Sequence, residues 1–292
     1  MPSTFVGPET WVHLSDLHFG TETRAVCDAL AELVAARRPS GVIVSGDVTQ
    51  RAKRGEFRKA SEFLRRIAGE ARLLVVPGNH DLPLFRVLER AFFPYRNFEA
   101  SFSPVRSVEL ASEGIFRFLL VNTTRPRRHK LGTLNPEQVE EVERTLRQCP
   151  EGAIRVVVLH HPLPAFSDTG AELSGDFADG AQARAVVQRW TRAGLDLVLC
   201  GHTHRPRVLR LTPPAELRGA SAPESAQLSR TPWLLQAGTG LSQRLRNESN
   251  SVFLLTGRAP EGLAVRPTIL LERLDYSESS ERFEKMSEVL LN

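Results

Sequence analysis

Six of the eight histidines in this 292-residue chain lie within five short polar motifs, together with aspartates and one asparagine. The motifs are Asp16-Leu17-His18, Gly46-Asp47, Gly78-Asn79-His80-Asp81, His160-His161-Pro162 and Gly201-His202-Thr203-His204. Carboxylate oxygens, amide oxygens and imidazole nitrogens all bind divalent metal ions. Mixed sets of them suit manganese, iron (Fe²⁺ or Fe³⁺) or zinc better than calcium or magnesium. The motifs therefore predict a hydrolytic centre that contains two metal ions.

Short apolar runs precede the motifs and indicate buried β-strands. Residues 42–45, 73–76, 156–159 and 195–200 are rich in Val and Leu and show no alternation, and residues 11–14 similarly precede the first motif. In an α/β sheet, the loops at the carboxyl ends of neighbouring strands meet at one crevice. We therefore expect seven side chains to converge there: Asp16, His18, Asp47, Asn79, His160, His202 and His204.

The remaining chain predicts alternating helices and strands. Apolar residues at helical spacing predict helices over 26–37, 57–67, 84–100, 135–146 and 181–193, and Pro94 must break or kink the third of them. Further strands are predicted at 105–110, 115–122, 208–211, 233–236, 252–256 and 264–272. In the last segment, 278–291, Phe283, Met286 and Leu290 fall at helical spacing. The fold class is therefore α/β.

The spread of the motifs bears on domain organisation. They extend from Asp16 to His204, and a site assembled from both ends of that stretch cannot straddle an open linker. We expect one catalytic domain over residues 1–273, with a mobile loop rich in Pro, Ala and Ser at 212–232. A helical tail at 274–292 would dock on this domain or pair with another subunit.

Composition and charge favour an intracellular protein with a phosphate-bearing substrate. The three cysteines form no disulfide framework, the amino terminus lacks a secretory pattern, and no apolar run is long enough to span a membrane. We therefore expect a cytoplasmic location. The formal net charge is +4, and only four of the 38 basic residues are lysine. The basic segment 125–130 would attract a phosphate ester if it lies at the crevice, so Arg127 and Arg128 are candidate substrate contacts.

Cleavage of a phosphate ester explains the need for these residue types. It requires a strong nucleophile at neutral pH and positive charge beside the phosphoryl oxygens. Two divalent ions about 3.5 to 4 Å apart supply both, because a water bound between them ionises readily. Holding the ions that close requires a shared carboxylate. Asp47, on the turn after a predicted buried strand, is the natural candidate.

The order of the five motifs resembles that of the calcineurin-like metallophosphoesterase superfamily, and the resemblance covers residues 11 to about 205. It implies a four-layer αββα sandwich of two mixed sheets flanked by helices. It also implies one metal held by Asp16, His18, Asp47 and His204, and a second held by Asp47, Asn79, His160 and His202. His80, which is no ligand, would contact the phosphate with Asn79 and protonate the leaving oxygen, and Asp81 would orient His80.

Departures from the superfamily pattern bear on the substrate. Protein serine/threonine phosphatases carry Gly-Asp-x-x-Asp-Arg-Gly, whereas this chain has Gln50 in place of the second aspartate. Its Ser-Gly-Asp-x-Thr-Gln-Arg-Ala and Ser-Asp-Leu-His-Phe-Gly segments are similar to those of bacterial phosphodiesterases of the class that includes cyclic-nucleotide enzymes (class III). We therefore expect hydrolysis of a cyclic nucleotide or another small phosphodiester.

Two alternatives stay open. A metal-dependent DNA or RNA exonuclease is compatible with the basic segment 125–130, although the 88 residues after His204 look too short and strand-rich for the additional parts that such nucleases carry. A protein-binding scaffold of the same fold is disfavoured because every ligand position and His80 hold the expected residue type.

The sequence also predicts where three further histidines and one cysteine lie. In the doublet at 160–161, His160 rather than His161 is the expected ligand. His13 is expected in the core, His129 on an exposed loop, and Cys200 in a buried strand.

Overall fold

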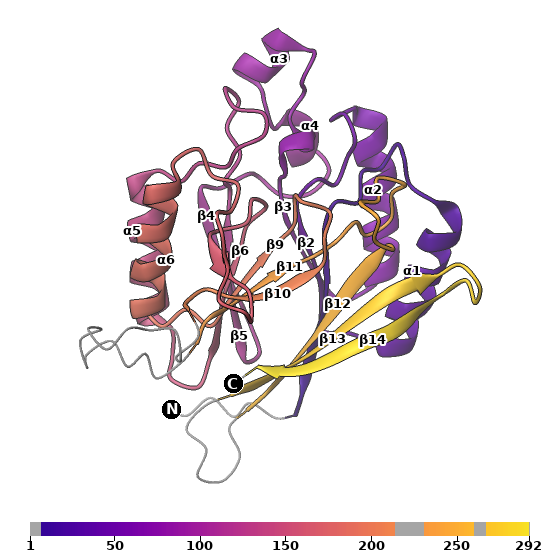
Figure 1. Ribbon diagram of the computed structural model, residues 1–292. Helices are drawn as coiled ribbons and strands as arrows, with labels where there is room; N and C mark the ends of the chain where they lie inside the picture. The colour runs from indigo at the N-terminus through magenta and orange to yellow at the C-terminus, as the bar shows by residue number, and fades with distance from the viewer. Residues whose placement is uncertain (1–6, 214–230, 260–266, 292) are drawn as a thin grey trace.

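Two mixed β-sheets lie face to face, and helices cover the outer face of each (Figure 1). The computed structural model describes residues 7–213, 231–259 and 267–291. Its four layers confirm the predicted αββα sandwich. Among the described residues, no helix has both the length and the apolar character needed to cross a membrane.

The first sheet carries three of the predicted motif strands in parallel. Its order is β14-β13-β12-β1-β2-β3, with β1, β2 and β3 parallel and the rest antiparallel. The strands are β1 (Glu9–Leu14), β2 (Gly41–Ser45), β3 (Arg72–Val76), β12 (Ser251–Arg258), β13 (Thr268–Ser277) and β14 (Arg282–Leu291).

The second sheet contains the other two motif strands at its centre. Its order is β4-β5-β6-β9-β11-β10-β7-β8, and β5, β6, β9 and β11 are parallel. The strands are β4 (Val108–Glu113), β5 (Phe116–Val121), β6 (Ile154–Val158), β7 (Ala165–Phe166), β8 (Glu172–Leu173), β9 (Leu197–Cys200), β10 (Arg207–Arg210) and β11 (Trp233–Gln236).

Three apolar layers join the sheets and helices. Helices α1 (Arg24–Arg37) and α2 (Arg54–Ala68) pack on the first sheet, and α5 (Pro136–Gln148) and α6 (Gly180–Arg192) pack on the second. The layer between the sheets includes Trp11, Phe116, Phe118 and Phe253. Trp11 and Phe118 have ring centroids 4.6 Å apart, so aromatic contacts fix one sheet against the other.

Most predicted elements are present. Asn135 caps α5 by accepting from the backbone N–H of Gln138, whose side chain reaches back as predicted. The predicted helix 84–100 is interrupted at Pro94, leaving α3 (Val87–Phe92) and α4 (Arg96–Glu99). The start of the strand predicted at 264–272 and most of the predicted mobile loop 212–232 lie outside the described residues.

The predicted helical tail at 274–292 is wrong for the described residues. The predicted boundary at residue 273 falls inside β13, and the following segment returns as β14 to pair with it. The register of this pair shifts between Arg273 and Leu274, opposite Met286. A β-bulge adds one residue to a strand and disrupts its alternation. The apolar residues of β14 therefore have a spacing that imitates a helix.

Removal of β14 gives a testable consequence. Ending the chain after Ser277 would leave the main-chain N–H and C=O groups of β13 unpaired at a sheet edge. Because such edges recruit other strands, we expect a lower melting temperature and concentration-dependent aggregation, seen by calorimetry and light scattering. The metal-binding motifs lie elsewhere, so specific activity of the folded fraction should be kept. A truncated chain that is as stable and monodisperse as the full chain would contradict this role of β14.

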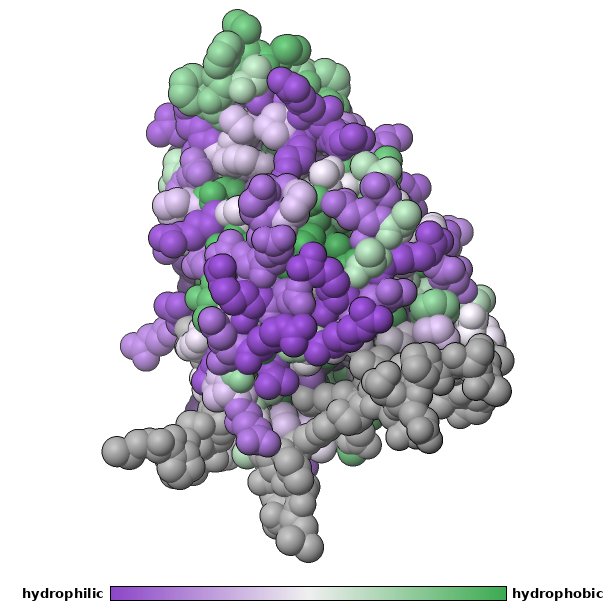
Figure 2. All heavy atoms as spheres, turned by 90° about the vertical axis from the view of Figure 1, so that its left-hand side faces the viewer, coloured by the Kyte–Doolittle hydropathy of each residue, from purple (hydrophilic) through white to green (hydrophobic). Residues whose placement is uncertain are grey.

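An exposed apolar patch surrounds α3 at the top of the molecule (Figures 1 and 2; Figure 2 shows it in green). Its side chains are 40–76% exposed and comprise Leu84, Phe85, Val87, Leu88, Phe92 and Phe93. Arg86 donates to the carbonyl of Ala52, and Arg90 donates to the carbonyls of Pro126 and Arg128. Helix α3 is therefore tied to two loops, one after β2 and one after β5.

Candidate metal centre

Five loops carry the predicted donors to the same edge of the sandwich. Asp16 and His18 follow β1, Asp47 follows β2, and Asn79 follows β3. From the second sheet, the histidine doublet follows β6, and His202 and His204 follow β9. The parallel direction of the motif strands within each sheet brings all seven donors together, as the sequence predicted.

One group of donor atoms gathers around Asp16. His18 Nε2 lies 3.7 Å and His204 Nε2 lies 3.4 Å from Asp16 Oδ1. The two imidazole Nε2 atoms are 3.3 Å apart. Asp47 Oδ2 lies 3.8 Å from His18 Nε2. Four donor atoms from two loops of the first sheet and one loop of the second therefore face a common point.

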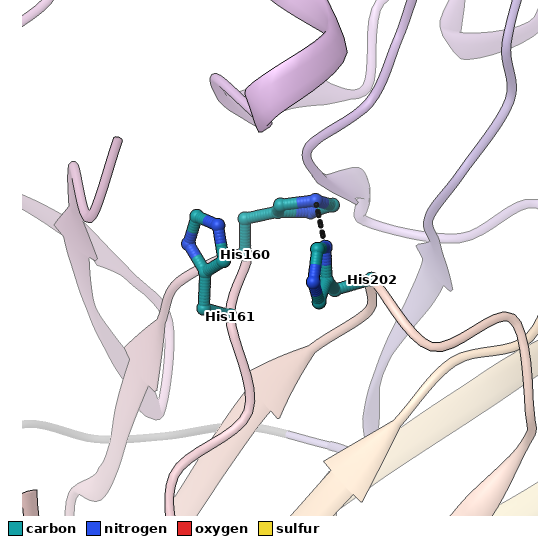
Figure 3. Close-up of side chains that lie close together, drawn as sticks. All are labelled: His160, His161 and His202. Carbon is teal, nitrogen blue, oxygen red and sulfur yellow. Dashed lines mark hydrogen bonds between the residues drawn. The ribbon is translucent and has the colours of Figure 1, made fainter. Parts of the chain in front are cut away.

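A second group gathers around Asn79. Its Oδ1 lies 3.1 Å from His160 Nε2 and 3.0 Å from His202 Nδ1. These two imidazole nitrogens are 3.3 Å apart, and Figure 3 shows the two rings side by side at the ends of their strands, nearly perpendicular to each other. Asp47 Oδ1 lies 3.4 Å from His160 Nε2. The two carboxylate oxygens of Asp47 thus belong to different groups, and Asp47 stands between them.

The donor set fits divalent metal ions. Asp16, His18, Asp47 and His160 are fully or almost fully buried, and Asp16 Oδ1 has no hydrogen-bond partner. Buried polar atoms without a partner are costly unless an ion or water binds them. The clusters Asp16–His18–His204 and Asp16–Asp47–His160 each place their donor atoms within 4.8 Å of one another and could hold a metal ion.

Hydrogen bonds behind the imidazoles fix their orientation. His160 Nδ1 donates to the carbonyl of Ser45 at 2.8 Å, and His204 Nδ1 donates to the carbonyl of Arg244 at 2.7 Å. A carbonyl oxygen can only accept, so Nδ1 carries the hydrogen in both rings. In the neutral form of each ring the lone pair is therefore on Nε2, toward the cluster, which is the arrangement found behind metal-bound histidines.

Burial and mutual charge set the protonation of the donors. Burial favours the neutral carboxyl, but the charge and hydrogen bond of His160 hold the pKa of Asp47 well below its usual range. Burial also opposes ionisation of Asp16, but the neighbouring imidazoles of His18 and His204 lower its pKa. Burial and the charge of His160 lower the pKa of His202 to about 4. Burial opposes protonation of His160, but Asp47 raises its pKa to about 9, so metal binding would displace that proton.

The backbone at the ligand positions adopts left-handed conformations. The φ angles are 53° at Asp16, 45° at His18, 49° at Asp47, 75° at His202 and 63° at His204. Residues with a Cβ atom avoid this region, and such conformations persist where the surrounding structure enforces them. The turns therefore aim the donors before any ion binds.

Glycines let the ligand loops approach each other closely. A Cβ at Gly78 would lie 2.1 Å from the backbone nitrogen of Asp47, and one at Gly201 would lie 1.8 Å from Ser15 Oγ. Contacts this short do not occur between real Cβ atoms and their neighbours. The glycines of these motifs are therefore required by packing between loops.

Gly78→Ala tests this packing. The added methyl group must displace the Asp47 turn, and overpacking of this kind costs about 1–3 kcal/mol. We expect a lower free energy of unfolding and reduced metal content, measured by denaturant titration and elemental analysis. The matched control is Gly55→Ala in α2, where a Cβ meets nothing within 4 Å. Normal metal content in Gly78→Ala would show that the loop can shift without harm.

The structure corrects the predicted role of Asp81. Its buried carboxylate accepts from the backbone N–H groups of Val48, Thr49 and Gly78, at 2.8 to 3.1 Å. It thereby links the loop after β2 to the loop after β3 and does not orient His80. Burial and the nearby charge of Asp47 raise the pKa of Asp81 to about 6, against the effect of these N–H donors.

His80 is oriented by other groups. Its Nδ1 donates to the carbonyl of Gln50 at 3.0 Å, and its Nε2 accepts from Arg244 Nη1 at 3.1 Å. The ring centroid of His80 lies 4.8 Å from that of His18 and 5.8 Å from that of His129. His80 therefore borders the first donor group, as predicted. His129 is half-buried beside His80, so its predicted exposure is wrong.

The predicted substrate contacts Arg127 and Arg128 are exposed. They line a pocket of about 570 Å³ together with Val87 and Arg90 of the α3 region. In the described part of the chain, neither makes a hydrogen bond or ion pair with a donor residue through its side chain. Their contact with substrate stays a prediction.

The other predicted placements are confirmed. His13 is buried and bonded to Ser45 Oγ at 2.8 Å, and Cys200 is buried in β9. His161 Nδ1 bonds to Thr123 Oγ1 at 2.8 Å, while its ring lies beside His202 (Figure 3). His161 also forms a possible metal cluster with His160 and His202, so the preference for His160 rests on its contacts with Asp47 and Asn79. Arg244, which contacts His80, was missed because it belongs to none of the motifs.

Comparison with known proteins finds a relative in sequence and solved structures of similar fold. Glycerophosphodiester phosphodiesterase GpdQ from Enterobacter lignolyticus (strain SCF1) is 26% identical over 206 residues, which cover 66% of this chain and 69% of GpdQ. The fold is similar to that of purple acid phosphatase PPD1 from yellow lupin (Lupinus luteus) seeds, with a TM-score of 0.66 and 13% identity; the match covers 97% of this chain but only 53% of PPD1. It is also similar to PhoD, with a TM-score of 0.63 and 12% identity over 100% of this chain and 74% of PhoD.

The family assignment rests on a sequence match to most of the chain. The family described as calcineurin-like phosphoesterase matches residues 10–206, the segment that contains all five motifs. The chain therefore belongs to the calcineurin-like phosphoesterases, a family of hydrolases that act on phosphate esters.

Proposed function

We propose that this protein is a phosphodiesterase that depends on two metal ions and hydrolyses a small phosphodiester. The observation that carries the proposal is the division of the buried donors into two groups that share Asp47 through its two carboxylate oxygens. A shared carboxylate is what holds two cations at the short separation that phosphoryl transfer requires.

In this proposal Asp47 binds both ions and every other donor binds one. Asp16, His18, Asp47 and His204 hold one ion. Asp47, Asn79, His160 and His202 hold the other. When bound, the ions supply an ionised water as nucleophile and neutralise charge on the phosphoryl oxygens. The donor chemistry suits Mn²⁺, iron or Zn²⁺.

The chain's own residues complete the chemistry. The amide of Asn79, itself one of the donors, and the imidazole of His80 beside the donors contact the phosphate. The Nδ1–H of His80 is held by the carbonyl of Gln50, so Nε2 lies beside the donors, where Arg244 contacts it. After taking up a proton from solvent at Nε2, His80 would pass this proton to the leaving oxygen, while Arg127 and Arg128 contribute positive charge at the rim.

Two features favour a diester over a phosphoprotein. GpdQ, the curated relative, is named as a glycerophosphodiester phosphodiesterase. Gln50 occupies the position where protein serine/threonine phosphatases carry an aspartate, and its side chain bonds to Arg244.

The deciding experiment is a substrate panel on manganese-loaded protein. The panel compares p-nitrophenyl phosphate, bis-p-nitrophenyl phosphate, glycerophosphodiesters, cyclic nucleotides, and single-stranded and duplex DNA. The proposal expects the highest kcat/KM on small diesters. Preference for DNA would favour the exonuclease alternative, and preference for monoesters would refute the diester assignment.

Metal analysis separates an enzyme from a binding scaffold of the same fold. We expect two equivalents of metal per chain after loading and desalting. A chain that retains none, and turns over no ester in the panel, would be a scaffold.

A further inference from the structure

An arginine outside the motifs reaches the candidate metal centre. Arg244 lies between β11 and β12, and its Nη1 is 3.1 Å from His80 Nε2 and 3.2 Å from Gln50 Oε1. The residue is half-buried. Among the ion pairs of the described residues none involves Arg244, so its charge is directed at two neutral acceptors beside the donors.

Hydrogen-bonding chemistry determines which atom donates and which accepts between Arg244 and His80. A guanidinium group can only donate, so His80 Nε2 must accept from Arg244. The carbonyl of Gln50 can only accept, so His80 Nδ1 must donate to it. In this arrangement the His80 nitrogen that would serve the substrate is occupied by Arg244.

The backbone of Arg244 is anchored to the metal centre itself. Its carbonyl accepts from His204 Nδ1 at 2.7 Å and from Thr239 Oγ1 at 3.0 Å. The position of the side chain is therefore set relative to a candidate ligand. This anchor uses main-chain atoms, so it survives replacement of the side chain.

Other arginines near the site are engaged differently. Arg90 donates to the carbonyls of Pro126 and Arg128, and Arg125 donates to the carbonyls of Asn122 and Thr124. Their guanidinium groups hold loops together. Among the described arginines, Arg244 is the one whose side chain bonds to His80.

We propose that Arg244 binds a non-bridging phosphoryl oxygen of the substrate and releases His80 Nε2 when it does so. The inference rests on the proposed function, because it assigns the phosphate contact of the same site. A guanidinium prefers a charged oxygen to a neutral imidazole nitrogen, and its planar fork suits phosphate. Gln50 Oε1 keeps the guanidinium at the edge of the centre during this exchange.

The test compares Arg244→Ala and Arg244→Lys with the matched control Arg246→Ala, an exposed arginine two residues away. Each manganese-loaded protein is assayed for metal content, for binding of inorganic phosphate by calorimetry, and for kcat and KM on the best diester of the panel. Guanidinium chloride at low concentration is then added to Arg244→Ala to test for chemical rescue.

We expect Arg244→Ala to keep its metal and to lose about tenfold to a hundredfold in kcat/KM and in phosphate affinity, as for a lost charge-assisted hydrogen bond. The losses of Arg244→Lys in kcat/KM and phosphate affinity should be smaller than those of Arg244→Ala, because an ammonium keeps the positive charge but not the planar pair of donors. Guanidinium should restore part of the activity of Arg244→Ala, and Arg246→Ala should match the parent.

Two outcomes would overturn the inference. One is an Arg244→Ala protein with parental phosphate affinity and kcat/KM. The other is loss of metal in both Arg244 variants without guanidinium rescue, which would assign the residue a structural role behind His204. Failure of the proposed function can be distinguished from failure of this inference. A parent protein that binds phosphate but hydrolyses no ester refutes the proposed activity. The phosphate titration of the variants then still tests whether Arg244 binds phosphate.

Discussion

Replacement of Asp47 by asparagine is expected to empty both metal positions and to abolish turnover. The two carboxylate oxygens face different donor groups, so one substitution removes a ligand charge from each. We expect metal content well below two equivalents and a loss in kcat of at least about 10³-fold, a small part of the rate enhancement typical of enzymes. Elemental analysis and the diester assay measure both effects.

The fold should survive this change. Asparagine has nearly the same shape as aspartate, and the neighbouring carboxylate of Asp81 still ties the loop to Gly78. The circular dichroism spectrum should therefore match that of the parent. Asp168→Asn is the matched control, because the side chain of Asp168 is 83% exposed and pairs with Arg210 away from the centre. Near-normal activity of Asp47→Asn would show that Asp47 is not shared between two ions.

Replacement of His80 by alanine is expected to slow the reaction while the metals stay bound. The imidazole is not among the proposed ligands, although it lies with His18 and Asp47 in a cluster that could hold a metal ion, and the backbone N–H of His80, which donates to Asp47 Oδ1, is kept in the variant. Loss of a general acid lowers the rate by about 10² to 10⁴. The loss should be larger for a diester with an alkoxide leaving group than for one with p-nitrophenolate, because only the alkoxide requires a proton.

The dependence on leaving group is the decisive measurement for His80. Equal losses on both diesters would indicate that His80 binds the phosphate without protonating the leaving oxygen. Unchanged kinetics on the poor leaving group would refute any part for His80 in the reaction. Metal content measured in parallel shows whether the variant has kept its ions.

The sequence predicted the seven donors because their positions follow from strand order. Each motif comes after a buried strand, and the motif strands within each sheet are parallel, so their carboxyl ends had to meet. The left-handed backbone at five of the donors could not be predicted. Aspartate and histidine disfavour that conformation, and it is imposed by contacts between loops distant in sequence.

The tail and Arg244 show where a local pattern fails. Phe283, Met286 and Leu290 have helical spacing, but the open edge of β13 offers main-chain hydrogen bonds that only a strand can satisfy. Arg244 is one of many arginines in the chain. Its importance lies in a contact with His80, 164 residues earlier, which no local pattern encodes.

The aromatic layer between the sheets has a consequence for chemistry far from it. Four of the seven candidate donors follow strands of the first sheet and three follow strands of the second, so the spacing of the donor atoms depends on how firmly the two sheets are held together. Trp11, Phe118 and Phe253 supply that bracing. Loosening this aromatic packing would therefore be expected to change the distances between the donors of the two sheets, although none of these rings touches a metal ligand position in sequence.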